Sequence, residues 1–381
     1  MHNSTIRLYP LNPDIIFGQQ VIYAGNANYG QPEDPVLVRL RYPKRRTKPL
    51  TFITGKLTLS SAIIWRKFSL PSIATNNESR EIQGETVKRI LITGAASGLG
   101  LSLAKKYASE GWSVCLADIQ DKEGVKTASQ LSEEHDNDCF FQHLDITSDA
   151  QWQELVAIIS ERWQGLDALI NNAGVGAAGD IDTFLLKDFQ WAVDINLMGA
   201  VKGCHVCVPL LKESKGLLIN VASMAGLVHM GNMSAYNVSK AGMVALSEGL
   251  LSELDPYGVK VSVVCPTFFQ SNLAKSMRSD NPDAAKIAAK LHAGTGITAE
   301  DIAATVFEES RKGKHTILAG TRLSDRIIWR LKRYLPGVYL SMMKSNARIQ
   351  LTDKNPTSAS SSSREAISTR VLRFIRGRLL G

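Results

Sequence analysis

The stretch "ITGAASGLG", residues 92–100, joins a short apolar run to a segment whose apolar residues recur at helical spacing. It holds three glycines, Gly94, Gly98 and Gly100. Glycine permits a tight turn that brings backbone N–H groups close to an anion, and the N-terminus of a following helix adds a positive dipole. No Gly-Lys-Ser/Thr ending follows, so the loop does not match the phosphate loop of nucleoside triphosphatases. The stretch therefore predicts an anion site between a strand and a helix.

The alternation of a β-branched apolar run with a helical period continues to about residue 320. The apolar runs predict strands at 87–94, 113–119, 139–147, 167–174, 216–223, 259–266 and 315–320. The segments between them predict helices, including one long helix over 185–213. Alternating units of this kind form parallel sheets covered on both faces, and right-handed crossovers make them doubly wound. We therefore predict a Rossmann-type α/β domain of about seven parallel strands over 85–320.

The segments outside this domain differ in composition. Residues 1–84 show no steady period and are predicted to be an N-terminal extension of uncertain structure. Residues 321–350 predict a basic amphipathic C-terminal helix, and the partly serine-rich residues 351–381 predict a disordered tail. The formal net charge of +8 comes from the two ends, because the middle of the chain is acidic. We therefore expect no nucleic-acid partner.

Cysteine usage and hydropathy indicate the compartment. The five cysteines are scattered and odd in number, which gives no disulfide framework and favours a reducing environment. Cys204 and Cys207 are spaced as a pair, but no second ligand pair accompanies them, so no metal site is predicted. The N-terminus lacks a secretory pattern, and no apolar run reaches the roughly 18 residues of a spanning helix. We expect a cytoplasmic protein.

The second predicted strand ends at Asp118, which follows the glycine-rich loop at the spacing of a dinucleotide site. An acidic side chain there accepts hydrogen bonds from the adenosine ribose and repels a 2′-phosphate. The neighbouring Ala96, Ser97 and Ile119 are uncharged, so no basic group is available to pair with that phosphate. The sequence therefore predicts NAD(H) as the preferred cofactor, with NADP(H) as the alternative.

Tyr236 and Lys240 in "SAYNVSKAG" lie four residues apart on a predicted helix, so their side chains share one face. A phenol titrates near about 10, and a nearby ammonium lowers that pKa, so the pair can serve as a general acid and base. Ser223 ends a predicted strand at the edge where α/β sheets bind ligands, and its hydroxyl suits a hydrogen bond to a carbonyl. Taken alone, each has a structural alternative: a solvated helix face for the pair and a turn cap for the serine.

Together these features resemble the short-chain dehydrogenase/reductase family over about residues 86–320. The matching motifs, in order, are "TGAASGLG" (93–100), "LDIT" (144–147), "NNAG" (171–174), "VDINLMG" (193–199) and "YNVSK" (236–240). The resemblance implies an NAD(P)-dependent oxidoreductase that transfers hydride between nicotinamide and a carbonyl or secondary alcohol. It also implies a homodimer or homotetramer, and a catalytic tetrad of Asn196, Ser223, Tyr236 and Lys240.

By that resemblance, Tyr236 exchanges a proton with the substrate oxygen, and Lys240 holds the nicotinamide ribose and lowers the pKa of Tyr236. Ser223 orients the substrate, and Asn196 holds a water in a proton relay behind Lys240. The chain departs from the family at Pro266-Thr267, where Pro-Gly is usual. The cofactor-binding positions carried over are Gly94, Ser97, Gly98, Leu99, Gly100, Asp118, Asp145, Ile146, Asn172, Ala173, Gly174, Tyr236, Lys240 and Pro266.

The substrate loop is expected at 267–296, where Phe268, Phe269, Leu273 and Met277 favour an apolar, lipophilic alcohol or ketone. Farther on, at 322–345, arginines recur at helical spacing beside an apolar stripe. Such a helix either lies on an anionic membrane, which would make the protein membrane-peripheral, or packs its stripe on the core or a dimer partner. Both interpretations stay open.

Two other classes of function are alternatives to this enzyme. An epimerase or dehydratase of the extended relatives would carry GxxGxxG spacing, which residues 94–100 lack. A non-catalytic nucleotide-binding or membrane-associated scaffold would keep the fold, but it would not need the whole tetrad. We therefore predict an NAD(H)-dependent dehydrogenase/reductase with Tyr236 as its general acid and base.

Overall fold

The computed structural model describes residues 87–271, 273, 276–281 and 294–354. The predicted N-terminal extension and all but the first four residues of the predicted tail lie outside the described residues. So do residues 282–293 of the expected substrate loop.

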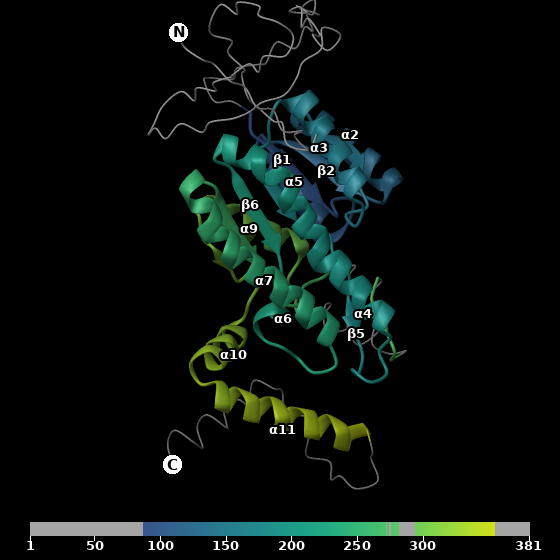
Figure 1. The fold of residues 1–381 in the computed structure, drawn as a ribbon, viewed down its shortest axis with the longest axis vertical. Helices are drawn as coiled ribbons and strands as arrows, with labels where there is room; N and C mark the ends of the chain where they lie inside the picture. The colour runs from purple at the N-terminus through teal and green to yellow at the C-terminus, as the bar shows by residue number, and fades with distance from the viewer. Residues whose placement is uncertain (1–86, 272, 274–275, 282–293, 355–381) are drawn as a thin grey trace, which may run out of the picture. The chain divides into compact units, whose positions relative to one another are not determined.

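A seven-stranded parallel sheet forms the centre of the described part of the chain (Figure 1). Its order is β3 (Phe140–His143), β2 (Ser113–Asp118), β1 (Arg89–Thr93), β4 (Ala168–Asn171), β6 (Leu217–Val221), β7 (Lys260–Val264) and β9 (Thr316–Ile317). The sheet extends from β1 in both directions, toward β2 on one side and β4 on the other. This doubly wound order confirms the predicted fold class and places the ligand crevice at the carboxyl end of β1.

The alternation of side chains along β1 shows how both faces of the sheet are covered. Ile90 and Ile92 pack into one core cluster, and the intervening Leu91 packs into another. The first cluster includes side chains from α1 (Gly98–Ser109), α2 (Asp121–His135) and α9 (Ala299–Arg311). The second includes side chains from α3 (Asp149–Trp163), α5 (Gly199–Ser214) and the end of α7 (Ser234–Leu254). The strands are therefore apolar on both sides, as buried parallel strands must be.

The predicted long helix over 185–213 is not one regular helix. It consists of α4 (Leu186–Val193), a π-helical segment η2 (Asp194–Met198) and α5. The wider π turn contains the fully buried Asn196, whose side chain bonds to the backbone of Val175 after β4. A polar side chain satisfied from outside the helix accompanies the local change in pitch, as is common for π turns at functional sites.

A small second sheet ties the segment after β7 to the middle of the chain. β5 (Ala177–Ala178) pairs in parallel with β8 (Arg278–Ser279). Arg278 pairs with Asp188 of α4 at 2.7 Å and lies over the ring of Trp191 at 3.9 Å. The described part of the expected substrate loop is therefore attached to the region of α4.

The predicted single helix over 321–350 was wrong, because two helices stand there: α10 (Leu323–Tyr334) and α11 (Pro336–Lys354). Proline has no N–H and disfavours helical backbone in the residue before it. Leu335 accordingly leaves the helix, with ψ at 61°. The last four residues of α11 also fall in the range predicted to be a disordered tail.

Only part of the predicted apolar stripe on this segment is covered. Leu331 packs beside Tyr339 and Met342 of α11 and Val228, which follows α6 (Met224–Leu227). Leu323 and Leu335 stay exposed.

Three further properties hold for the described residues. None of their helices has the length and hydropathy needed to cross a bilayer. They contain no cluster of side chains suited to hold a metal ion. All five cysteines are buried free thiols.

Candidate active site

The glycine-rich loop turns sharply at the carboxyl end of β1. Gly94 has φ at +65°, and its N–H donates to the carbonyl oxygen of Ala117 on β2 at 2.8 Å. A Cβ at Gly94 would lie 2.8 Å from the Cα of Ala173, and one at Gly100 would lie 2.0 Å from the oxygen of Gly94. The loop, the start of α1 and the segment after β4 therefore pack too closely for side chains at these two positions.

The N-terminus of α1 is open toward the sheet edge. Ser97 is its N-cap residue but accepts no capping hydrogen bond from the first turn. A Cβ at Gly98 would meet no atom within 4 Å. Backbone N–H groups at a helix start need acceptors, and the space in front of them suits a phosphate oxygen. Gly98, Leu99 and Gly100 begin this helix, so the loop fits the pyrophosphate of a dinucleotide.

Asp118 ends β2 beside the loop and is only 6% exposed. Its Oδ2 accepts from the backbone N–H of Ala96 at 2.9 Å, and its Oδ1 accepts from the N–H of Gln120 at 3.1 Å. The Gln120 amide also donates to Oδ1 of Asp118 at 3.2 Å and to the Ser97 hydroxyl at 3.4 Å. The carboxylate is thus fixed against the loop. Gln120 was not predicted from the sequence, because a lone glutamine in a turn carries no signal.

The residues after β4 are braced from β1. The Thr93 hydroxyl accepts from the N–H groups of Asn172 and Ala173 at 3.0 and 3.1 Å. The Asn172 amide donates to the carbonyl oxygen of Thr93 at 2.9 Å. Beneath them, Asn171 donates to the Asn220 amide oxygen on β6 at 2.9 Å. These bonds link β4 and the residues after it to β1 on one side and to β6 on the other, at the carboxyl end of the sheet.

The predicted adenine-contacting segment follows β3. Asp145 uses Oδ1 to accept from the N–H and the hydroxyl of Thr147, at 2.9 and 2.8 Å. The carbonyl oxygen of Ile146 accepts from the indole N–H of Trp152 at 3.0 Å. The turn is therefore rigid, and an adenine contact by Asp145 or Ile146 stays a prediction.

Ser223 and Tyr236 come together at the carboxyl end of β6. Ser223 is the N-cap of α6, and its Oγ accepts from the N–H of Ala225 at 3.1 Å. Burial raises the pKa of Tyr236, and the interaction of its phenol with the Ser223 side chain opposes that rise. The two hydroxyls therefore form a proton-handling pair.

Lys240 lies one turn farther along α7. Its Nζ donates to the carbonyl oxygen of Val221 at 2.9 Å and stands 5.9 Å from the centre of the Tyr236 ring. Burial lowers the pKa of Lys240 to about 8, and Cys265 opposes that shift. The expected lowering of the Tyr236 pKa by this ammonium is not found: burial raises the pKa of Tyr236, and the opposing interaction comes from Ser223.

Asn196 is fully buried behind Lys240. Its Oδ1 accepts from the N–H of Val175 at 2.7 Å, and its amide donates to the Val175 carbonyl at 2.9 Å and to the Ser239 hydroxyl at 3.2 Å. Gly174 separates the two functional side chains: a Cβ there would lie 2.9 Å from Oδ1 of Asn196 and 3.4 Å from Nζ of Lys240. Asn196 and Lys240 therefore meet at a position that only glycine fills without displacing a neighbour.

Pro266 closes the site from β7. Its carbonyl oxygen accepts from the N–H of Met224 at 2.9 Å, directly beside Ser223. Thr267, which stands where the family has glycine, donates its N–H to the carbonyl of Ala319 at 3.2 Å. The departure from the family motif is accommodated by regular pairing toward β9.

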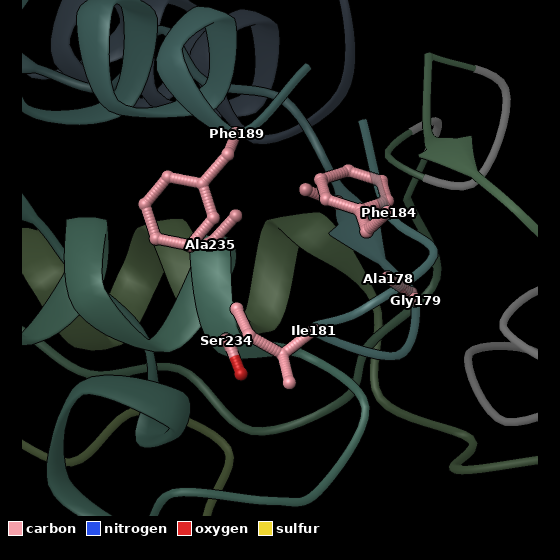
Figure 2. A pocket seen from close by; sticks show the side chains of 8 residues that line it. Ala178, Gly179, Ile181, Phe184, Phe189, Ser234 and Ala235 are labelled. Carbon is pink, nitrogen blue, oxygen red and sulfur yellow. The ribbon is translucent and has the colours of Figure 1, made fainter. Parts of the chain in front are cut away.

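Apolar side chains surround Tyr236. It shares a cluster with Ala235, Phe184 and Ala192, against which Leu273 of the expected substrate loop also packs. Phe269, in contrast, packs against the core cluster of α1 and α9. A shallow apolar recess opens beside this cluster, as Figure 2 shows, and is lined by Ala177, Ala178, Gly179, Ile181, Phe184, Phe189, Ser234 and Ala235. The sequence did not predict this recess, because its walls come from segments about 50 residues apart that share no motif.

The comparisons agree with this geometry. A family model described as short chain dehydrogenase matches residues 88–282. The trans-4-hydroxycyclohexanecarboxylate dehydrogenase of Sinomonas cyclohexanicum is 34% identical over 184 residues, 47% of this chain and 71% of the relative. The 3-beta-hydroxysteroid dehydrogenase of Comamonas testosteroni is 32% identical over 190 residues, 49% of this chain and 72% of the relative.

A solved structure agrees as well. The crystal structure of a short chain dehydrogenase/reductase from Burkholderia phymatum, in complex with NAD, has a TM-score of 0.60 and 28% identity, and covers 72% of this chain and 98% of that one. The family match begins just before β1 and spans the loop, Asp118 and all four residues of the tetrad. The chain therefore belongs to the short-chain dehydrogenase/reductase family of oxidoreductases, which act on alcohols and their carbonyl counterparts.

Proposed function

We propose that the domain over 85–320 catalyses the NAD(H)-dependent interconversion of an apolar secondary alcohol and its ketone. One observation carries the proposal: Tyr236 lies among apolar side chains and interacts with Ser223, which follows β6 at the carboxyl edge of the sheet. The open N-terminus of α1 is at the same edge. The reaction needs a pair of groups that handle protons, an apolar surface for the substrate and a phosphate site for the cofactor.

The cofactor would be held by the glycine-rich loop at its pyrophosphate and by Asp118 at the adenosine ribose. When bound, the nicotinamide supplies or accepts the hydride. The preference for NAD(H) rests on the buried carboxylate of Asp118, whose charge repels a 2′-phosphate. NADP(H) is the alternative cofactor, but its 2′-phosphate would have to bind against the negative charge of Asp118.

Each residue of the tetrad has a distinct part in the proposal. Tyr236 gives its phenolic proton to the carbonyl oxygen in reduction and takes a proton from the alcohol in oxidation. Ser223 donates to the same substrate oxygen and orients it. Lys240 holds a positive charge behind the phenol, and Asn196 keeps the segment after β4 in place next to Lys240. A water relay through Asn196 stays a prediction, and so does the contact of Lys240 with the nicotinamide ribose.

The surroundings of Tyr236 favour an alicyclic substrate. Phe184, Leu273 and Ala192 offer apolar surface beside Tyr236. The two curated relatives are named for a hydroxycyclohexane carboxylate and a hydroxysteroid. A ring alcohol with an apolar body fits both the cluster and these names.

We also propose peripheral contact of residues 322–345 with an anionic membrane. Arg326, Arg330 and Arg333 are exposed along α10, and Leu323 and Tyr334 beside them are each 71% exposed. A basic face with exposed apolar groups is typical of helices that lie on anionic lipid. Sedimentation with anionic and with neutral vesicles tests the contact: binding to the anionic vesicles alone is expected. Assembly as a homodimer or homotetramer and a cytoplasmic location stay predictions.

The enzymatic proposal is tested with the purified full chain. NADH and NADPH are titrated by fluorescence, and a panel of alicyclic alcohols and ketones is assayed, with Tyr236→Phe as the control. We expect tighter binding of NADH, turnover of apolar ring alcohols, and loss of turnover without loss of NADH binding in the variant. Turnover that survives in Tyr236→Phe overturns the proposed chemistry. NADH binding with no turnover on any substrate favours the non-catalytic scaffold.

A further inference from the structure

The C-terminal helix pair contacts the segment that joins the two catalytic hydroxyls. Residues 227–233 lead from α6, which Ser223 caps, to α7, which carries Tyr236. Residues of both α10 and α11 bond to this segment. Figure 1 labels α6, α10 and α11, so the chain can be followed from one to the next. The helix pair begins beyond residue 282, where the family match ends.

Lys332 of α10 makes the central contact. Its Nζ donates to the carbonyl oxygen of Leu227, the last residue of α6, at 2.7 Å. The same Nζ lies 3.2 Å from each ring nitrogen of His229. A cation at the carboxyl end of a helix satisfies a carbonyl that has no partner within the helix, and it complements the helix dipole. Lys332 is therefore suited to hold α6 at its far end, opposite Ser223.

The second helix, α11, adds a hydrogen bond and apolar contacts to the same segment. Tyr339 of α11 donates its hydroxyl to the carbonyl oxygen of His229 at 3.3 Å. Its ring is 3% exposed and packs with Met342 against Val228. Val228 in turn donates its N–H to the carbonyl oxygen of Met224 at 2.7 Å, which closes α6. Polar and apolar contacts from α10 and α11 thus hold the same three residues, Leu227, Val228 and His229.

The start of α10 is tied to the other side of the expected substrate opening. The Thr267 hydroxyl, just after β7, donates to Oδ2 of Asp325 at 3.3 Å. The Arg322 guanidinium donates to the carbonyl oxygen of Thr295 at 3.2 Å. One helix therefore bridges the loop after β6 and the loop after β7, which are the two loops nearest to Ser223 and Pro266.

We infer that α10 and α11 brace the loop after β6, and that Lys332 is a positioning residue that sets α6 and hence the Ser223 hydroxyl. This inference rests on the proposed function, because it assigns Ser223 and Tyr236 their parts in the reaction. Lys332 touches no reacting atom in it. Its ammonium fixes the carbonyl of Leu227, and this fixes the short helix whose first residue orients the substrate oxygen.

The test compares three variants of the full chain. Lys332→Met keeps the aliphatic stem but removes the ammonium, and Lys332→Arg keeps a charged donor. Lys126→Met is the matched control, because Lys126 is an exposed lysine on α2, outside the proposed substrate site and the proposed membrane face. Loss of one charged hydrogen bond predicts a fall of about tenfold in kcat/KM for the alcohol in Lys332→Met, carried mainly by KM. The dissociation constant for NADH should not change, Lys332→Arg should recover most of the loss, and Lys126→Met should match the wild type.

Hydrogen exchange gives a readout that does not depend on turnover. The amide of Val228 should exchange faster in Lys332→Met than in Lys126→Met, because the hydrogen bond of this amide to Met224 closes α6. Equal exchange rates and equal kinetic constants in the two variants overturn the inference. If Lys332→Met does not fold, Tyr339→Phe, which removes only a hydroxyl, takes its place. Faster exchange of the Val228 amide and a lower kcat/KM are then expected of Tyr339→Phe, and unchanged values overturn the inference. An inactive wild type with faster Val228 exchange in Lys332→Met contradicts the proposed function alone.

Discussion

The ammonium of Lys240 donates to the carbonyl oxygen of Val221 at 2.9 Å, and the side chain is almost completely buried. Desolvation disfavours the charged form, so the pKa of Lys240 falls from 10.5 to about 8. The folded protein therefore keeps a buried charge beside its candidate acid and base at the expense of stability. Such a position is expected where activity and stability conflict.

Lys240→Met should stabilise the protein at neutral pH. Between pH 8 and 10.5 the unfolded chain binds more protons at Lys240 than the folded one, so the penalty is complete below pH 8 and is lifted as pH rises through that window. Relief of about 3 kcal/mol, less about 1 kcal/mol for the lost hydrogen bond, predicts a net gain of about 2 kcal/mol in the free energy of unfolding at pH 7. Denaturant unfolding at pH 7 and pH 10 measures it. An equal gain at both values contradicts the prediction.

Ser223→Ala should move the pH profile of alcohol oxidation upward. Oxidation needs the deprotonated phenol, and Ser223 opposes the rise that burial causes in the pKa of Tyr236. Without the Ser223 hydroxyl this pKa rises further, so kcat/KM for oxidation reaches its alkaline plateau at a higher pH. The profile is measured from pH 7 to 11 in both proteins, with the surface variant Ser160→Ala as control. A lower plateau at an unchanged pH would limit Ser223 to orienting the substrate.

Gly174→Ala should reduce turnover through two neighbours at once. The new methyl group would lie 2.9 Å from Oδ1 of Asn196 and 3.4 Å from Nζ of Lys240, and both side chains are buried. We expect kcat to fall at least about tenfold and the free energy of unfolding to fall by about 1–3 kcal/mol. Gly249→Ala on α7 is the matched control, since a Cβ there meets no atom within 4 Å. It should leave kcat unchanged and stabilise the helix slightly.

The sheet and the loop could be predicted because their signals are local. β1 carries apolar residues on both faces and ends at Gly94, whose positive φ a side chain would resist. Tyr236 and Lys240 share a helix face by their spacing alone. The break between α10 and α11 was equally local, since Pro336 stands at the start of the second helix. The arginine pattern across it led to the prediction of one helix.

The rest depends on partners far apart in the chain. Lys332 and Leu227 are 105 residues apart, and no periodicity of either segment indicates that they meet. The side chains of Asn171 and Asn220 are hydrogen-bonded between adjacent strands. In the sequence each is only an amide near the end of a predicted strand, and nothing indicates that the two meet. The side chain of Asn196 in the π segment likewise bonds to the backbone of Val175, which lies between β4 and β5. Long-range hydrogen bonds of this kind determine the site, and only the fold reveals them.

Asp118→Asn should weaken the discrimination between the two cofactors. The amide oxygen still accepts from the N–H of Ala96, so the loop keeps that anchor, while the bonds from Gln120 and the charge facing a 2′-phosphate are removed. Because the carboxylate is only 6% exposed, water screens its charge weakly, and the lost repulsion should tighten NADPH binding about tenfold relative to NADH. Asp121→Asn is the control, because it removes the same charge three residues away at the start of α2. If the two variants change the ratio of dissociation constants equally, the effect is one of overall charge, and Asp118 does not select the cofactor.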